Sequence, residues 1–348
     1  MRRVDVALPL AAPVRSRDPA GDALRAWAIV GVVAIHGLDL TLGAATFKWV
    51  SSYFRWAVPA FIVLSAYYTA LASLRQGAMP LLPWLRARYL KLLPPFVFFS
   101  MFYLLMFADL PNLTVRKLLT THLSGYGWTG QYFFIVLFQL LPVIWLLATR
   151  RVSGILVLIT LGLGLALYIW APYGFAGSLL LRQLSDRPFL YWLPYCVWGV
   201  FLAQRQERWL ARVQALPAWL KAVLVLSLPL LIAAMPGPVG HDSPYVMPMV
   251  LLVSIFYVPL CLGSFNSGAG RLGGYLGQHS MSVFCMNPLF IGLYRAYDPM
   301  DKVWGADKWA SSVGMHVAGS ALLLVSVVAA CLLTGATLKR LGLGAVLP

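Results

Sequence analysis

The sequence predicts an all-α fold: a polytopic integral membrane helical bundle with about ten transmembrane helices in a single domain. The 348 residues are 60% hydrophobic and only 11% charged, and the mean hydropathy is +0.78. Soluble domains carry about 25% charged residues, so this composition excludes a soluble globular protein. The formal charge of +16 is spread along the chain. Because no soluble basic domain is visible, we also exclude a nucleic-acid-binding protein.

The expected helices follow from the apolar stretches. A hydrocarbon core is crossed by about 20 consecutive, mostly apolar residues. The stretches that satisfy this requirement lie approximately at 23–43, 56–75, 93–110, 130–148, 152–171, 187–203, 219–235, 245–262, 276–294 and 313–337. The segments between them are short, so an active site must be built largely from the helices.

The basic residues predict the orientation of the bundle. If both ends of the chain lie inside, about two thirds of the 27 Lys and Arg residues fall on the inner side, in agreement with the positive-inside rule. Residues 1–21 are too polar for the core of a signal peptide. We therefore expect a cytoplasmic N-terminal tail at 1–21, a transmembrane domain at 22–340 and a short cytoplasmic C-terminal tail at 341–348.

The first predicted helix carries a polar stripe. Arg25 and His36 are eleven residues apart, so on an α-helix they face the same way, roughly 16 Å apart along the axis. Asp22 lies one turn before Arg25, and Asp39 lies one turn after His36. Ionisable groups inside a bilayer are costly and indicate a functional site, although a structural hydrogen bond between helices would also explain them.

The four cysteines do not suggest a metal site. Each falls in a different predicted helix, and none has CxxC or other metal-ligand spacing: Cys196, Cys261, Cys285 and Cys331. We expect them to be small packing residues, and we expect no metal and no bound cofactor.

Five short patterns occur in an order that resembles one known family. The first is the basic residue and the histidine on the first helix. The others surround Ser65 after a proline, the paired arginines before Pro94, the aromatic run after Gly130, and the Leu-Gly…Ser…Pro element that ends at Pro288. Together they resemble acyltransferase family 3, bacterial membrane enzymes that O-acylate exopolysaccharides and related glycans. The resemblance implies a multi-pass enzyme of the inner (cytoplasmic) membrane that uses acetyl-CoA as its acyl-donor substrate.

Three positions depart from the family pattern. Ala66 follows Ser65 where the family usually has Gly, Asn287 stands where many relatives carry His, and Gln131 occupies a region where some relatives are acidic. An asparagine forms hydrogen bonds but cannot act as a base near pH 7. His36 is therefore the main candidate for proton transfer.

The expected donor-binding residues are cationic and lie towards the inner face. Arg86 and Arg88 approach this face from the start of the third helix, Lys91 lies about one turn further, and Arg25 begins the first helix. Arginine forks suit the phosphates of acetyl-CoA. Juxtamembrane anchoring to anionic lipid also explains such residues, and the family pattern favours a binding site.

The expected catalytic residues are His36 and Asp39. His36 could deprotonate an acceptor hydroxyl or carry the acyl group itself. Asp39 could fix the tautomer of His36, or it could face water at the outer interface, and spacing alone leaves both open. We expect the acceptor-side or supporting residues to be Ser65, Gln131, Tyr132, Ser280 and Asn287. For outer-face aromatic residues such as Tyr132, the ordinary aromatic belt is an alternative explanation.

The sequence thus favours an O-acetyltransferase that moves acetyl from cytoplasmic acetyl-CoA to a hydroxyl of an exopolysaccharide or a lipid-linked glycan. Its partners would be the lipid bilayer and proteins of polysaccharide assembly. The alternative is a proton-coupled or anion transporter that uses Arg25, His36 and Asp39. Transporters often contain inverted repeats, and none is visible here, which favours the enzyme. A scaffold in an assembly complex is a third reading, and it would tolerate alanine at His36.

Overall fold

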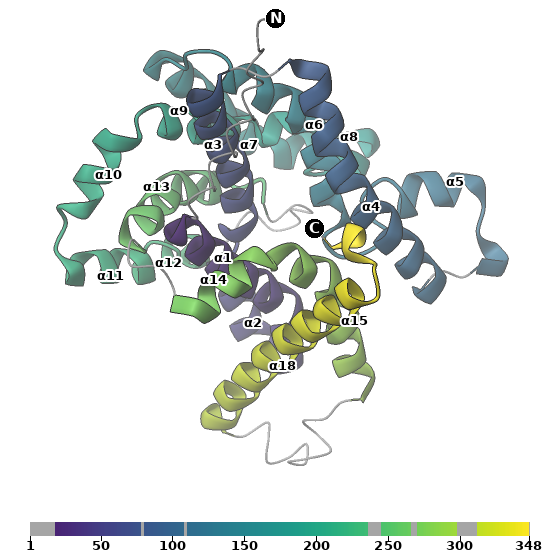
Figure 1. Cartoon of the computed structure of the whole chain (residues 1–348). Coiled ribbons are helices and arrows are strands. Elements are labelled where there is room, and N and C mark those ends of the chain that lie inside the picture. Colours follow the sequence, from purple (N-terminus) through teal and green to yellow (C-terminus); the bar gives the residue numbers. More distant parts are fainter. Residues whose placement is uncertain are drawn as a thin grey trace, which may run out of the picture.

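The computed structural model describes residues 18–77, 80–107, 110–235, 245–265, 270–297 and 312–347. These residues form helices joined by turns, and no strand occurs among them (Figure 1). The α-helices are α1 (Pro19–Gly37), α2 (Ala44–Tyr53), α3 (Ala57–Gln76), α4 (Leu81–Phe107), α5 (Val115–Lys117), α6 (Gln131–Ala148), α7 (Gly154–Gly177), α8 (Leu179–Leu184), α9 (Leu193–Gln204), α10 (Gln206–Gln214), α11 (Ala218–Ser227), α12 (Leu230–Ala234), α13 (Pro248–Ser264), α14 (Gly270–Gln278), α15 (Ser280–Tyr297) and α18 (Val313–Arg340).

The helices confirm an all-α membrane bundle but do not establish its number of spans. Within the described residues, six helical segments are long and apolar enough to cross a membrane. A seventh results if α10 and the α11–α12 segment, which are bent by 105°, count as one span. Helices α9 and α13 are apolar but shorter. The expected count of about ten therefore stays a prediction.

Individual boundaries show where prolines change the expected helices. Helices α3 and α6 nearly coincide with the predicted spans at 56–75 and 130–148. Helix α4 begins at Leu81, twelve residues before the predicted start, and contains Pro94 and Pro95 in its interior. Helix α9 begins only at Leu193, because a 3-10 turn precedes it and Pro194 occupies its first turn, where a missing N–H costs no helical bond.

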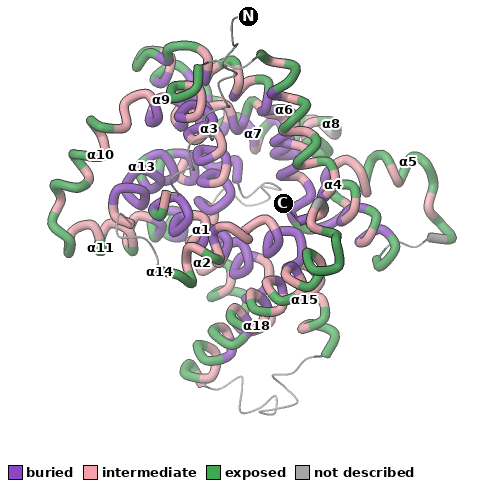
Figure 2. The backbone as a smooth tube through the Cα atoms, in the orientation of Figure 1, coloured by how far each residue is buried: buried purple, intermediate pink, exposed green. Residues whose placement is uncertain are grey.

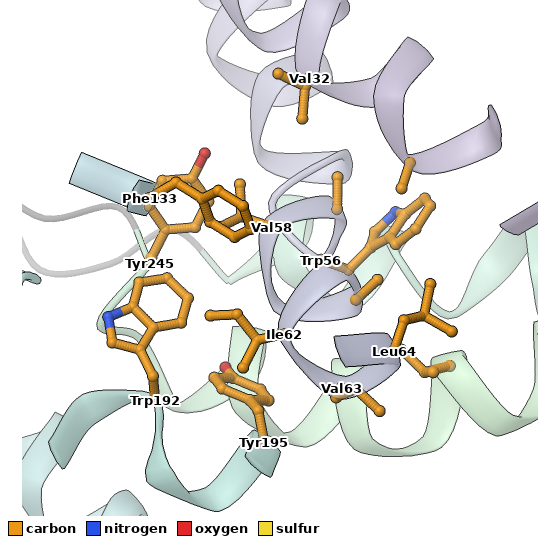
Figure 3. Packing of buried hydrophobic residues seen from close by; sticks show 14 of the residues in the cluster. Val32, Trp56, Val58, Ile62, Val63, Leu64, Phe133, Trp192, Tyr195 and Tyr245 are labelled. Atoms are coloured by element: carbon orange, nitrogen blue, oxygen red, sulfur yellow. The ribbon is translucent and has the colours of Figure 1, made fainter. Parts of the chain in front are cut away.

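Helix α3 lies at the centre of the core. It packs against α1, α6, α9 and α13, and its residues Val58 and Ile62 lie among the aromatic side chains of Trp192, Tyr195 and Tyr245 (Figure 3). Helices α3 and α9 approach closely because α9 carries Gly199. A Cβ atom at this position would lie 2.5 Å from the carbonyl oxygen of Val63. Figure 2 shows that buried residues gather on α1, α3 and α13, whereas α5, α10 and α11 carry mostly exposed and intermediate residues.

Contacts between helix ends define two ends of the bundle. Arg25, Arg75 and Arg88 line one cavity, so the starts of α1 and α4 lie beside the end of α3. We call this the inner end, after the predicted orientation. At the other end, which we call the outer end, the segment after α1 meets α15 and α18. Thr41 Oγ1 lies 2.8 Å from Ser320 Oγ, and the Asp39 carboxylate lies 2.6 Å from the Arg295 guanidinium.

Both predicted tails differ from the expectation at their helical borders. Helix α1 begins at Pro19, so residues 19–21 belong to the bundle; residues 1–17 lie outside the described part. At the C-terminus, the 3-10 turn Gly344–Val346 packs against α4, and the side chain of Leu347 is fully buried. Within the predicted tail at 341–348, the turn Gly344–Val346 and Leu347 therefore pack on the bundle, whereas residues 341–343 are exposed.

Candidate active site

The start of α1 builds a polar corner at the inner end. Asp18 caps the helix by accepting hydrogen bonds from the backbone N–H groups of Ala20 and Gly21, which lack partners within the helix. The hydroxyl of Tyr68, from α3, donates a 2.7 Å hydrogen bond to the same carboxylate. The capping residue therefore also joins α1 to α3.

Arg25 is held in position by Asp22 and Tyr68. Its guanidinium donates to the Asp22 carboxylate at 2.8 Å and lies 4.7 Å from the centroid of the Tyr68 ring. Gln278 of α14 donates to the other oxygen of Asp22 at 3.4 Å. Gly277 permits this approach, because a Cβ atom there would lie 2.1 Å from the carbonyl oxygen of Asp22.

These residues line a cavity of about 640 Å³. Three arginines from three helices contribute to its wall: Arg25, Arg75 and Arg88. Asp22, which also lines it, is already paired with Arg25. Such a wall offers several planar hydrogen-bond forks to a ligand that carries phosphates or carboxylates. We call this the inner cavity.

The structure brings together only part of the predicted donor-binding set. Arg25 and Arg88 line the inner cavity, whereas Arg86 and Lys91 are exposed and do not. Arg86 instead lines a shallow hollow with Leu82, Pro83, Ala87 and Leu90. For Arg86 the reason is helical geometry, since it is two residues from Arg88 and such side chains point to different sides of a helix.

Arg75 was missed by the sequence analysis as a binding residue. It lies in the last turn of α3, and its only sequence signal is its contribution to the positive-inside bias. Its position beside Arg25 depends on how α3 packs against α1. Sequence spacing does not reveal this packing.

His36 lies near the other end of α1, on the side that Arg25 also faces. Eleven residues separate the two, which corresponds to roughly 16 Å along the axis. The imidazole is half-buried and makes no hydrogen bond with any residue in the described ranges. Arg55, in the break between α2 and α3, lies within electrostatic range of His36. His36 thus combines a free imidazole with a nearby cation.

Asp39 lies beyond the end of α1 and pairs with Arg295 rather than with His36. Helix α1 ends at Gly37, and Asp39 belongs to a 3-10 turn, so the spacing expected from a continued α-helix does not apply. Its exposed carboxylate pairs with Arg295 of α15 at 2.6 Å. Of the two predicted alternatives for Asp39, the structure favours the one at the outer surface.

Gln131 is fully buried, and its side-chain amide forms hydrogen bonds within the protein through both its oxygen and its nitrogen. Its oxygen accepts from the backbone N–H of Gly127 at 2.7 Å. Its nitrogen donates to Ser100 Oγ at 2.7 Å and to the carbonyl oxygen of His122 at 2.5 Å. This network ties the start of α6 to α4 and to the preceding loop, which is a structural role.

The remaining predicted residues lie apart from one another. Ser65 donates to the carbonyl oxygen of Phe61 one turn earlier. Ser280 is half-buried at the start of α15. Tyr132 contacts Tyr245 with ring centroids 5.8 Å apart and planes tilted by 35°, and it lies within electrostatic range of Arg55. Asn287 is buried in α15 and bonded to backbone carbonyl groups of its own helix. Of these four, Tyr132 is the one that shares a neighbour with His36.

The fold is that of a helical membrane protein, and three arginines line a cavity at one end of its bundle. Comparison with known families identifies the class: the family model of the acyltransferase domain matches residues 19–335. The chain therefore belongs to acyltransferase family 3 and is a membrane acyltransferase. No curated protein and no solved structure matches the chain.

Proposed function

We propose that the protein transfers an acetyl group from cytoplasmic acetyl-CoA to a hydroxyl of an exopolysaccharide or lipid-linked glycan across the inner membrane. The observation that carries this proposal is the arrangement along α1. Cations line a cavity at its inner end, and a histidine without hydrogen-bond partners in the described residues lies near its outer end.

The inner cavity would bind the phosphates of acetyl-CoA. Arg25, Arg75 and Arg88 supply the cationic contacts, and Asp22 fixes the orientation of Arg25 through their 2.8 Å hydrogen bond. The pantetheine arm of CoA is long and thin, so it suits a path along the helix towards His36. The thioester would then lie near the imidazole.

His36 would take part in one of two balanced reactions. As a base, it takes the proton of the acceptor hydroxyl while the oxygen attacks the thioester carbonyl, and the proton then passes to the leaving CoA thiolate. As a carrier, its nitrogen attacks the carbonyl, CoA leaves as a thiol, and the acyl-imidazole reacts with the hydroxyl. In both routes negative charge develops on the carbonyl oxygen. The cation of Arg55 is available to stabilise it.

Mass spectrometry of surface and exported glycans tests the function. Deletion of the gene should remove acetyl groups from one glycan, and the wild-type gene should restore them. The His36→Ala gene should not restore them, although its product accumulates equally in the membrane. Unchanged acetylation in the deletion strain would overturn the proposed function.

A further inference from the structure

A groove lies between α9, α10, α11 and α13, and Trp209 lines both this groove and the inner cavity. It has a volume of about 610 Å³. Helices α10 and α11 form an arm at the left edge of the bundle in Figure 1, and the groove runs between this arm and the helices behind it. None of the proposed donor-binding or catalytic residues lines it.

The arm has the geometry of a helix that lies along the membrane surface before the chain turns into the bilayer. Helix α10 is bent by 105° from the α11–α12 segment. Pro217 precedes α11 and interrupts the backbone hydrogen bonds between the two helices. The sequence of α10 is polar and charged, whereas that of α11 is apolar. Such an arrangement is typical of the boundary between headgroups and hydrocarbon.

One end of the groove is strongly cationic. Arg205, Arg208 and Arg212 line it, and among the described residues no acidic side chain does. Arg208 and Arg212 are one turn apart on α10, so their side chains lie on the same side and repel each other. Arg205 donates to the carbonyl oxygen of Val152 at 3.1 Å, and its guanidinium lies 3.9 Å from the Phe201 ring centroid. An anion between Arg208 and Arg212 would relieve their repulsion.

The remaining walls of the groove are apolar. Phe256 and Leu260 of α13 face Leu224 of α11 across it. The indoles of Trp198 and Trp209 also line the groove, and their N–H groups already donate to the carbonyl oxygens of Ile255 and Leu202, each at 2.8 Å. The walls therefore offer an extended ligand hydrophobic contact and no free indole N–H.

We propose that this groove binds one anionic phospholipid, with its phosphate against Arg208 and Arg212 and its acyl chains along Phe256 and Leu260. The apolar walls give the polar body of a nucleotide no hydrogen-bond partners, and a zwitterionic lipid would leave the arginines without a net counter-charge. The predicted orientation places the arginines at the inner leaflet, where anionic phospholipids attract basic residues. The occupant is thus a structural lipid, and the proposal does not depend on the proposed function.

Native mass spectrometry of the purified, delipidated full-length protein tests the proposal. Phosphatidylglycerol and phosphatidylcholine with identical acyl chains are titrated separately into the detergent solution. We expect one phosphatidylglycerol molecule to bind about tenfold more tightly than phosphatidylcholine, because the choline cation of phosphatidylcholine cancels the phosphate charge that the arginines attract. Equal affinities for the two lipids would overturn the proposal.

Variants locate the site. Arg208→Gln with Arg212→Gln should abolish the preference for phosphatidylglycerol, whereas Arg208→Lys with Arg212→Lys should largely retain it and so exclude a folding defect. The matched control, Arg86→Gln with Lys91→Gln, removes two exposed cations from α4 and should bind like the wild type. An unchanged preference in the double Gln variant would overturn the proposal. Tighter binding of a polyprenyl phosphate than of phosphatidylglycerol would also overturn it, by assigning the groove to a lipid carrier.

Discussion

The side-chain amide of Asn287 donates a 2.8 Å hydrogen bond to the carbonyl oxygen of Phe284. In a regular helix this carbonyl would accept from the backbone N–H of residue 288, which is a proline and has none. Tyr103 of α4 stabilises the same turn of α15, because its hydroxyl donates to the carbonyl oxygen of Cys285 and accepts from the N–H of Leu289. Asn287 therefore supplies the hydrogen bond to Phe284 that Pro288 cannot donate, and it stabilises this turn of α15.

Replacement of Asn287 should lower stability. Asn287→Ala removes the side-chain donor and leaves the carbonyl oxygen of Phe284 without a partner, at a cost of about 1–3 kcal/mol. Thermal unfolding of the purified protein in detergent measures the loss. Ser326→Ala, which removes one hydrogen bond within α18, is the control and should change the unfolding temperature less. A normal unfolding temperature combined with lost acetylation would instead indicate a chemical role for Asn287.

Donor binding should depend on the arginines that line the inner cavity. Arg75→Ala and Arg88→Ala should each weaken acetyl-CoA binding about tenfold or more, because a hydrogen bond to a charged group contributes about 1.5–3 kcal/mol. Lysine at either position should restore binding only in part, since it lacks the planar fork. Isothermal titration with acetyl-CoA measures the affinity.

Arg86→Ala is the matched control for this prediction. It removes the same charge from the same helix as Arg88→Ala, but its side chain lies outside the inner cavity. We expect its affinity for acetyl-CoA to equal that of the wild type. If Arg86→Ala lowered the affinity for acetyl-CoA as much as Arg88→Ala does, Arg86 would belong to the donor site, and its position outside the inner cavity would not explain binding.

The residues that could be predicted from the sequence are those whose partners lie on the same helix. Arg25 and His36 share a side of α1, as their spacing predicted. The part that Arg75 plays in the inner cavity depends on packing between helices, so sequence spacing could not reveal it. The hydrogen bonds of Gln131 depend on the loop before α6, and sequence periodicity does not describe loops. Spacing left two placements open for Asp39, and the end of α1 at Gly37 and the ion pair with Arg295 favour the one at the outer surface.

The orientation of the bundle can be tested with reporter fusions. Fusions after Gln76, Arg151 and Arg340 should report the cytoplasm, because these positions follow helices that end among the basic residues of the predicted inner side. A fusion after Lys117 should report the periplasm. A periplasmic signal after Arg340 would contradict the orientation and move the inner cavity away from cytoplasmic acetyl-CoA.

Asp39→Asn should have little effect on acetylation. The carboxylate forms an exposed ion pair with Arg295, and such surface pairs contribute about 0–1 kcal/mol. Glycan acetylation and the unfolding temperature are measured at equal expression, with Arg295→Gln as the paired variant. Both variants should behave alike. If Asp39→Asn alone abolished acetylation, Asp39 would have a catalytic role that its position in this structure does not explain.

His36 should be required for chemistry and not for folding. Gln at this position forms hydrogen bonds but cannot accept a proton near neutral pH, so both His36→Gln and His36→Ala should lose glycan acetylation while unfolding at the wild-type temperature. A structural histidine would behave differently, because Gln would preserve its hydrogen bonds and its activity. Radiolabelled acetyl-CoA then separates the two proposed reactions. Label that joins the wild-type protein in the absence of acceptor, and is absent from His36→Gln, indicates an acyl carrier, whereas no label in the wild type indicates a base. Near-normal acetylation by the Gln variant would remove His36 from the reaction altogether.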